Sequence, residues 1–590
     1  MAHDTSDDVI EKMPSAHVTR IVWSRRCGLH KLVAFACWSR SPLKHSVSLY
    51  SSDSPIRDQV NQSTVVVPKD MSVSQYLLQD AGKRASHTAL IDGKTDRRIS
   101  FERLQDDIHT LTSAFYHLGL RHRDIVTMYA TNVPEIAHVF CSVTDNGAAL
   151  SLANSQLTAD DLASQLRQTR SRLLITTPDC ADTALAASAL SPYTQEVICI
   201  GQAPGCRPLS DLLQNKHLPP HPRIHIKPDS TTALIPFSSG TTGPPKGVML
   251  SHINIISDLC QLRHPLFVRM SGEEDVTLCA LPTMHIAGIV LGMCLPLSQG
   301  APTIVLPRYN PQDFLQAVQH YRVTFSQVVP SIISFMAKHP MVDKFDVSSF
   351  TKILSGAAAL SKELTEAFID RLNINGIMQG YGMTEASPAT HVSPRGFSKH
   401  GSIGVPLPLT HSKIVDTVTG ADLGPGKEGE VCVKGPQVMM GYLKNRTATQ
   451  AAFTSDAWLR TGDLGFYDED GYYYIIDRLK DIIKYKGYQI SPCHLESIIL
   501  NHPDVEDAAV VGIPTKGVGE VPRAFVVAKP GVTEKVLTDL VAEHVAPYRH
   551  LRGGVEFVEN IPRNPSGKIL RRVLRDRKMS RQERQKVWGN

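Results

Sequence analysis

Residues 238–247 form the segment of this chain whose composition most clearly suits a chemical task. They read Ser-Ser-Gly-Thr-Thr-Gly-Pro-Pro-Lys-Gly. Glycines let backbone N–H groups approach an anion, hydroxyls add donors and a lysine adds positive charge, so the segment predicts a phosphate-binding loop. It is not the common mononucleotide loop, in which Ser or Thr follows Gly-Lys, because Gly247 follows Lys246 here. The candidate phosphate contacts are Ser238, Ser239, Gly240, Thr241, Thr242, Gly243 and Lys246.

A second segment, 380–385, reads Gly-Tyr-Gly-Met-Thr-Glu. Tyr381 could stack on a base and Thr384 could bond a phosphate. Glu385 could hold Mg²⁺, directly or through water, because Mg²⁺ prefers oxygen ligands. The alternative for this segment, as for the first, is an ordinary glycine-rich surface loop or turn.

Two charged residues suit the recognition of a sugar. Segment 458–463 predicts Asp463 on a glycine turn, where an ionised carboxylate can accept hydrogen bonds from two ribose hydroxyls. Arg478 lies in the charged run 477–481, where we expect a hinge. Each has a structural alternative, since Asp463 could be a turn residue or a helix cap and Arg478 one half of a surface ion pair.

Near the end of the chain, residues 562–568 place Lys568 on a Gly/Pro-rich loop. A lysine in such a loop is usually solvated. The functional interpretation rests on the joint occurrence of five segments in one chain, all of which suit parts of the same nucleotide. Together they predict a binding site for a nucleotide.

Regular elements are expected to position these residues. The β-branched run 231–235 predicts a buried strand before the first loop, and apolar residues 248–250 lead into Ser251, a suitable helix N-cap. From Met71 onward, helical patterns alternate with short β-rich runs, which predicts an α/β fold with mostly parallel sheets. The helical patterns include 73–79 and 101–118, and the β-rich runs include 125–129, 173–177, 303–306, 323–325 and 414–415.

A change in composition near residue 480 predicts a domain boundary. The aromatic and β-branched run 472–476 predicts a strand before it. Beyond it, a helix starting at Ser491, strands at 507–512 and 523–528 and a helix at 533–544 suffice for a small α+β domain. The predicted organisation is an extension of unassigned role (1–70), a large multi-lobed N-terminal domain (71–479) and a small mobile C-terminal domain (480–590).

Composition and charge exclude several classes. The 62 Lys and Arg against 57 Asp and Glu are scattered, so no nucleic-acid partner is expected. The 11 cysteines contain no C-x-x-C pair, which favours reduced thiols. No apolar run is long enough for a transmembrane segment, although contact of the N-terminal stretch with a membrane surface stays an alternative. We expect a cytoplasmic protein because the chain lacks a C-terminal Ser-Lys-Leu type signal, while the N-terminal extension leaves organelle targeting open.

From about Met71 to Lys568 the chain resembles the adenylate-forming superfamily, and within it the branch of 4-coumarate CoA ligases and acyl-CoA synthetases. The resemblance implies an enzyme that uses ATP and Mg²⁺ to activate a small-molecule carboxylic acid as acyl-AMP and then transfers the acyl group to CoA. It implies catalytic roles for Lys568, His285, Thr384 and Glu385, with Mg²⁺ at Glu385 and His285 at the acyl pocket. It further implies adenine and phosphate contacts from Gln379, Gly380, Tyr381 and Thr384, ribose contacts from Asp463 and Arg478, a hinge at Lys480, acyl-adenylate contacts from Lys484 and Gln489, and CoA contacts from Lys486 and Gly487.

Three residues depart from the pattern of the 4-coumarate ligases. Ala287 stands where tyrosine is common, Ala359 where proline is usual and Ala389 where valine is usual. A wider pocket without a polar partner discriminates poorly between acids, so we expect a medium-chain, aryl or specialised polyketide-type acid.

Three other functions stay open from the sequence. Only 22 residues follow Lys568, so a carrier domain that accepts the acyl group would have to belong to a separate protein. A luciferase-like oxygenase shares the same motifs. A degenerate binding protein would lack site residues, and this chain retains every one of them.

Overall fold

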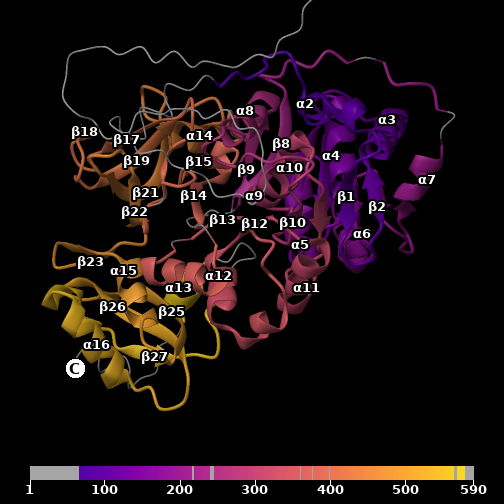
Figure 1. Cartoon of the computed structure of the whole chain (residues 1–590). Helices are drawn as coiled ribbons and strands as arrows, with labels where there is room; N and C mark the ends of the chain where they lie inside the picture. Colours follow the sequence, from indigo (N-terminus) through magenta and orange to yellow (C-terminus); the bar gives the residue numbers. More distant parts are fainter. Residues whose placement is uncertain are drawn as a thin grey trace, which may run out of the picture. The chain divides into compact units, whose positions relative to one another are not determined.

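The computed structural model describes residues 65–577 of the 590-residue chain, except 216–217, 223, 239–244, 359, 375, 398 and 564–567. Most of the predicted N-terminal extension therefore lies outside the described residues. The described part contains two large, mostly parallel sheets, one antiparallel sheet and a smaller C-terminal sheet (Figure 1). The described phosphate-loop candidates are only Ser238 and Lys246, because the other predicted contacts lie outside: Ser239, Gly240, Thr241, Thr242 and Gly243.

The sheet that carries the phosphate loop has eight strands. The pairs are parallel except the two at one edge, where β9 pairs antiparallel with both β8 and β20. Its central strands are buried along their whole length, as expected of parallel strands covered by helices on both faces. The order is β20 (Gly441–Tyr442), β9 (Lys246–Ser251), β8 (Thr232–Ser238), β4 (Ala149–Ala153), β3 (Ile125–Tyr129), β5 (Leu173–Thr176), β6 (Glu196–Cys199) and β7 (Arg207–Pro208).

The second large sheet has nine strands, parallel in the middle and antiparallel at both edges. Its order is β16 (Val405–Pro406), β15 (Ala389–Val392), β14 (Met378–Gly382), β13 (Lys352–Ser355), β12 (Phe325–Val328), β10 (Thr277–Cys279), β11 (Thr303–Val305), β1 (Thr88–Asp92) and β2 (Arg98–Ser100). The predicted mostly parallel α/β fold is thus confirmed.

Capping residues and apolar spacing specify the helices around these sheets. Ser100 begins α3 (Phe101–His117) by accepting a hydrogen bond from the backbone N–H of Arg103. Ser251 begins α8 (His252–Leu262) with a capping box, which confirms the predicted N-cap. The other helices are α2 (Val73–Leu78), α4 (Glu135–Asp145), α5 (Ala159–Thr169), α6 (Ala181–Ala189), α7 (Leu209–Gln214), α9 (Ile286–Ile289), α10 (Leu295–Gln299), α11 (Pro311–Tyr321), α12 (Pro330–Lys338), α13 (Lys362–Leu372) and α14 (Arg446–Ala452).

A five-stranded antiparallel sheet follows, and it corrects one prediction. Its order is β18 (Asp422–Leu423), β17 (His411–Val415), β19 (Gly429–Lys434), β21 (Leu459–Tyr467) and β22 (Tyr473–Arg478). The run 414–415 was expected to continue the parallel pattern, but it belongs to β17, whose neighbours are both antiparallel. Alternating burial along β17 is typical of an antiparallel strand with one covered face, and two apolar residues were too short a run to reveal it.

Beyond residue 480 a separate apolar core forms. Its buried residues extend from Ile483 to Leu574, and its sheet contains β23 (Ile483–Tyr485), β24 (Tyr488–Ile490), β25 (Val505–Thr515), β26 (Gly519–Ala528) and β27 (Val555–Phe557). Helices α15 (Pro492–Leu500) and α16 (Glu534–His544) lie beside this sheet, and α17 (Arg571–Arg575) ends the described chain (Figure 1). Both long helices begin as predicted, with Ser491 and Thr533 as N-caps. The predicted boundary between 479 and 480 stays a prediction.

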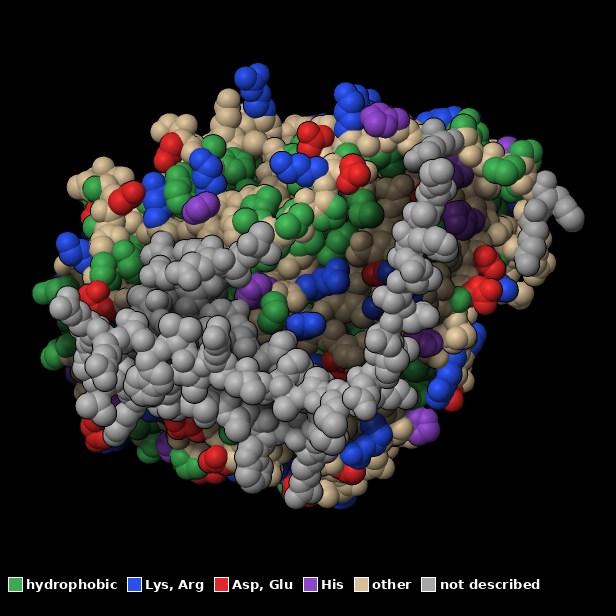
Figure 2. Space-filling view, turned by 45° about the horizontal axis from the view of Figure 1, so that its top comes forward, with side chains coloured by type: hydrophobic (Ala, Val, Ile, Leu, Met, Phe, Trp, Pro, Cys, Tyr) green, Lys and Arg blue, Asp and Glu red, His purple; other side chains and the backbone are tan. Residues whose placement is uncertain are grey.

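The surface is mixed in charge. On the face that Figure 2 presents, basic and acidic side chains are interspersed with apolar ones and form no continuous basic stripe outside the grey atoms. All nine cysteines of the described residues are free thiols. No helix within the described ranges is both long and apolar enough to cross a membrane.

Candidate active site

The described ends of the phosphate loop are held together by the pairing of β8 and β9. The antiparallel register sets Ser238 opposite Lys246, so the loop leaves and re-enters the sheet at one place. The ammonium group of Lys246 lies 5.0 Å from the centroid of the Tyr442 ring. Tyr442 belongs to β20, which pairs with β9.

Tyr442 also reaches the second predicted segment. Its hydroxyl donates a hydrogen bond of 2.8 Å to Oε1 of Glu385, whose side chain is almost completely buried. Thr384 begins the same 3₁₀ turn and is partly buried. Tyr442 therefore connects Lys246 with Glu385, a role that sequence reasoning missed. Its partner is 57 residues away along the chain, and nothing in its own neighbourhood marks it as more than a core aromatic.

Strand β14 presents the residues that precede Glu385. Gln379 is buried and its carbonyl accepts a hydrogen bond from the backbone N–H of Ser393, while Gly380 and Tyr381 follow on the same strand. The Tyr381 hydroxyl donates to Oδ2 of Asp463 at 2.6 Å. Burial, together with the nearby charge of Asp463, raises the pKa of Tyr381 well above its usual value, so the hydroxyl stays protonated and donates.

Asp463 and Arg478 face each other on neighbouring strands. The register pairs them directly, and Nε of Arg478 lies 3.0 Å from Oδ1 of Asp463. The sequence predicted Asp463 on a glycine turn, which is wrong, because Asp463 lies within β21. The local feature is a bulge in which residues 461–463 oppose only Val431 of β19, and Gly462 supplies the positive φ of 72° that the bulge requires.

Lys568 joins this cluster from the C-terminal core. Burial and the neighbouring Arg478 lower the pKa of Lys568 to about 8, while the carboxylates of Asp463 and Asp481 oppose that shift. The pKa of Lys480 is lowered to about 8 by burial and then by the same arginine. Residues from both sides of the predicted boundary therefore interact electrostatically at one place.

His285 interacts electrostatically with Lys568. It caps α9, where its Nδ1 accepts a hydrogen bond of 3.4 Å from the backbone N–H of Ala287. Burial and then the charge of Lys568 lower the pKa of His285 to about 4, so the imidazole is neutral near pH 7. The structure therefore brings this histidine to the same site as the lysine.

Comparisons with known proteins show the family to which the chain belongs. The family model "AMP-binding enzyme" matches residues 77–443, and the model "AMP-binding enzyme C-terminal domain" matches residues 494–568. The chain belongs to the AMP-binding enzyme family. It is 38% identical over 530 residues to a probable 4-coumarate–CoA ligase 1 from Dictyostelium discoideum, covering 87% of this chain and 96% of the relative. It is 35% identical to 4-coumarate–CoA ligase 1 from Solanum tuberosum, covering 87% and 95% of the two chains.

Solved structures of similar fold include enzymes with bound nucleotides. The anthranilate CoA ligase AuaEII in complex with anthranoyl-AMP has a TM-score of 0.79 at 26% identity, covering 86% of this chain and 97% of its own. ATP-bound MatB from Rhodopseudomonas palustris has a TM-score of 0.78 at 26% identity, covering 86% and 99%. The AMP-binding fold therefore extends over nearly the whole described chain.

Glu385 fits the magnesium that AMP-binding enzymes use. Mg²⁺ commonly takes one or two protein carboxylates and fills its other positions with water and substrate phosphates. The buried Glu385 carboxylate uses one oxygen for Tyr442, and it lies in the same cluster as Lys246 of the phosphate loop. No group of three or more His, Cys, Asp or Glu side chains that could hold a metal ion occurs within the described part of the chain.

The four residues predicted to contact the acyl-adenylate and CoA lie together on one hairpin. Lys484 pairs with Gln489 across β23 and β24, and Lys486 and Gly487 form the turn between them with φ values of 47° and 83°. Positive φ at both positions is typical of a type I′ turn. Among the described residues, no hydrogen bond or ion pair links any of these four to Glu385 or Asp463. A cavity of about 400 Å³ instead lies beside Lys480 and Lys484.

Replacing Tyr442 with phenylalanine should weaken the binding of Mg·ATP. The substitution leaves the ring but removes the hydrogen bond that orients Glu385. A hydrogen bond to a charged group contributes about 1.5–3 kcal/mol, so we expect roughly a tenfold or larger rise in Kd. Calorimetric titration with Mg·ATP measures it. Tyr129→Phe is the matched control, because it removes a tyrosine hydroxyl that donates to Ser155 and Leu157 from β3. Equal affinities in the two variants would contradict the role.

The pH dependence of acyl-AMP formation should follow Lys568. Its charged form is lost as the pH rises through about 8, and kcat/KM reports the pKa values of the free enzyme. We therefore expect kcat/KM for ATP in pyrophosphate exchange to decline above about pH 8. Whatever activity Lys568→Arg retains should show no such decline, because arginine stays charged. A decline that persists in this variant and disappears in Lys480→Gln would assign the titration to Lys480 instead.

Proposed function

We propose that this chain is an AMP-forming acid–thiol ligase. It converts a carboxylic acid and ATP into acyl-AMP and pyrophosphate, and it then transfers the acyl group to CoA. The observation that carries the proposal is the convergence of Lys568 with Asp463 and Arg478, because a mobile cation and a sugar-binding carboxylate then share one site. Relatives named 4-coumarate–CoA ligases, which match 87% of the chain, support the same reaction class.

In the first half-reaction, a carboxylate oxygen of the acid attacks the α-phosphorus of ATP and pyrophosphate leaves. Extra negative charge builds up on oxygens that are already anionic, and donors fixed in advance stabilise it. Lys568 carries the positive charge to this position, while Asp463 accepts hydrogen bonds from the ribose. Glu385 would hold Mg²⁺, and the bound ion would supply positive charge to neutralise the phosphates. No side chain has to act as a general base, because the acid is already ionised.

In the second half-reaction, the CoA thiol attacks the acyl carbonyl and AMP leaves. The thiol needs the space that Lys568 occupies during adenylation. We propose that the C-terminal domain, residues 480–590, rotates about Lys480 and replaces the Lys568 segment with the hairpin of Lys484, Lys486, Gly487 and Gln489. The separate core from Ile483 to Leu574 supports movement as one body.

The acid is proposed to be medium-chain, aryl or polyketide-type. Ala287 and Ala389 offer only methyl groups, and their backbones are fixed by buried partners. Gln327 donates to the carbonyl of Ala287 at 2.9 Å, and the backbone N–H of Ala389 donates to Asp258 at 3.2 Å. The pocket therefore presents no hydroxyl at these positions to recognise a phenol.

Mass spectrometry of products tests the proposal. Purified protein is incubated with ATP, Mg²⁺ and a panel of carboxylic acids, with and without CoA. Acyl-CoA that forms only when CoA is present would establish the ligase and name its acid class. Acyl-AMP that persists despite CoA would indicate a carrier protein or another acceptor, and absence of acyl-AMP with every acid would refute adenylation. A highest kcat/KM for 4-coumarate would contradict the proposed acid class.

A further inference from the structure

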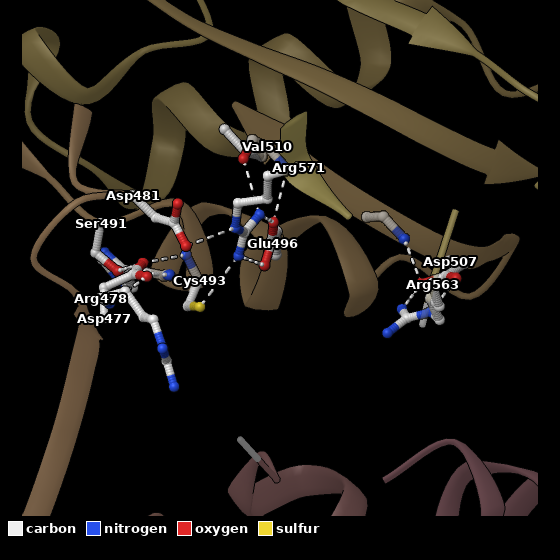
Figure 3. A network of polar contacts seen from close by, with 12 residues as sticks. Asp477, Arg478, Asp481, Ser491, Cys493, Glu496, Asp507, Val510, Arg563 and Arg571 are labelled. Atoms are coloured by element: carbon white, nitrogen blue, oxygen red, sulfur yellow. Dashed lines mark hydrogen bonds and ion pairs between the residues drawn. The ribbon is translucent and has the colours of Figure 1, made fainter. Parts of the chain in front are cut away.

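Two arginine–carboxylate pairs flank the segment that carries Lys568. On its N-terminal side, the guanidinium of Arg563 binds both carboxylate oxygens of Asp507 in β25, at 2.7 and 3.3 Å. On its C-terminal side, the guanidinium of Arg571 binds both carboxylate oxygens of Glu496 in α15. Figure 3 shows these two pairs on separate elements of the C-terminal core. The lysine segment is thus attached to that core at both ends.

The two ends of the segment also pair with each other. Arg563 and Ile569 form an antiparallel bridge, and the backbone N–H of Leu570 donates to the carbonyl of Pro562 at 2.8 Å. Lys568 lies immediately before this bridge on the returning arm. The position of its backbone is therefore determined by how firmly the two arms are held.

Arg571 is the more deeply buried anchor. The exposed fraction of its side chain is 10% and that of Glu496 is 9%. Its guanidinium also donates to the carbonyl of Val510 at 2.9 Å and to Sγ of Cys493 at 3.4 Å. Its Nε lies 3.9 Å from Oδ2 of Asp481, the residue next to the proposed hinge lysine. All sides of the guanidinium therefore face fixed acceptors (Figure 3).

We propose that Arg571, with Arg563 as a second anchor, is a positioning residue that holds Lys568 at the site of adenylation. The proposal rests on the role given to Lys568 above. A flexible lysine stabilises a transition state well only if its backbone is fixed beforehand, and a misplacement of about 1 Å can cost about 100-fold in rate. Because Arg571 also reaches Asp481, it connects the segment to the residues about which the domain turns.

The test compares Arg571→Ala with Arg572→Ala. Arg572 lies next along the same helix, is 81% exposed and forms an ion pair, among the described residues, only with Asp576, so it controls for helix and charge. We expect Arg571→Ala to lower kcat for acyl-AMP formation about 10- to 100-fold, with KM for ATP little changed. Thioester formation from supplied acyl-AMP should stay within about twofold of wild type. Arg571→Lys should recover part of the loss.

A second measurement separates positioning from folding. Hydrogen exchange should become faster in α17 of Arg571→Ala while α16 keeps its protection. If this variant does not fold, Glu496→Gln, which keeps the shape of the partner, takes its place. Equal losses in both half-reactions, or unchanged exchange in α17, would overturn the proposal. If wild-type protein forms no acyl-AMP, the proposed function fails, and the exchange data still decide whether Arg571 fixes the segment.

Discussion

Replacing Lys568 with alanine is expected to lower the rate of acyl-AMP formation by about 10²–10³-fold, the loss typical of removing one preorganised donor. Thioester formation from supplied acyl-AMP should change little, because the lysine is proposed to leave the site before CoA enters. The partly buried side chain interacts electrostatically with Arg478 and Asp463, so alanine removes a positive charge from this cluster. Pyrophosphate exchange measures the first half-reaction, and acyl-CoA release from synthetic acyl-AMP measures the second.

Lys529→Ala is a suitable control for this prediction. Lys529 belongs to the same C-terminal core, is 58% exposed and pairs only with Asp504 among the described residues. It should leave both half-reactions unchanged. If Lys568→Ala slowed both half-reactions equally, the division of labour between the two domain orientations would be wrong.

Replacing Asp463 with alanine should have the second large effect. The substitution removes the hydrogen-bond acceptor of Tyr381 and the ion-pair partner of Arg478. It also removes a negative charge that raises the pKa of Lys568, so that lysine should lose its proton at lower pH. We expect kcat/KM for ATP to fall by at least about 100-fold, through weaker ribose binding and a less charged lysine.

The stability of this variant should fall as well. Breaking a fully buried ion pair costs about 3–5 kcal/mol, but the Arg478 side chain is 32% exposed, so about 2–3 kcal/mol is expected. Urea unfolding measures this change. Asp463→Asn keeps an acceptor for Tyr381 and should be less destabilised, while Asp422→Ala, at an exposed edge of the same sheet, should behave like wild type. Wild-type ATP affinity in Asp463→Ala would show that the carboxylate does not bind the ribose.

Local signals made the elements of this fold predictable. The β-branched run before the phosphate loop became β8, and the caps Ser251, Ser491 and Thr533 begin helices where the sequence placed them. Each of these signals acts within a few residues of the chain. The antiparallel sheet around β17 was missed because a two-residue apolar run does not reveal whether its neighbours are parallel or antiparallel. The cytoplasmic location stays a prediction, as no structural feature bears on it.

Contacts between residues far apart in the sequence were harder to predict. Short segments singled out Tyr381, Asp463, Arg478 and Lys568 as candidates, and the resemblance to a known family gave them roles. The structure brings these four residues into electrostatic contact. Tyr442 could not be found this way, because its function depends on a carboxylate in another segment. The same holds for Arg571, whose partner Glu496 lies 75 residues away on another element. Sequence motifs reveal the residues that contact substrate more readily than they reveal the residues that position them.

The contacts around Asp477 add a further consequence. Its Oδ2 accepts hydrogen bonds from the Ser491 hydroxyl at 2.8 Å and from the backbone N–H of Cys493 at 2.9 Å (Figure 3). Asp477 precedes the proposed pivot and its two partners follow it, so the proposed rotation should separate them. These contacts should therefore bias the resting enzyme towards the orientation proposed to activate the acid. CoA must bind the alternative orientation more tightly by at least the same free energy, so its apparent affinity reports this conformational equilibrium as well as its own contacts.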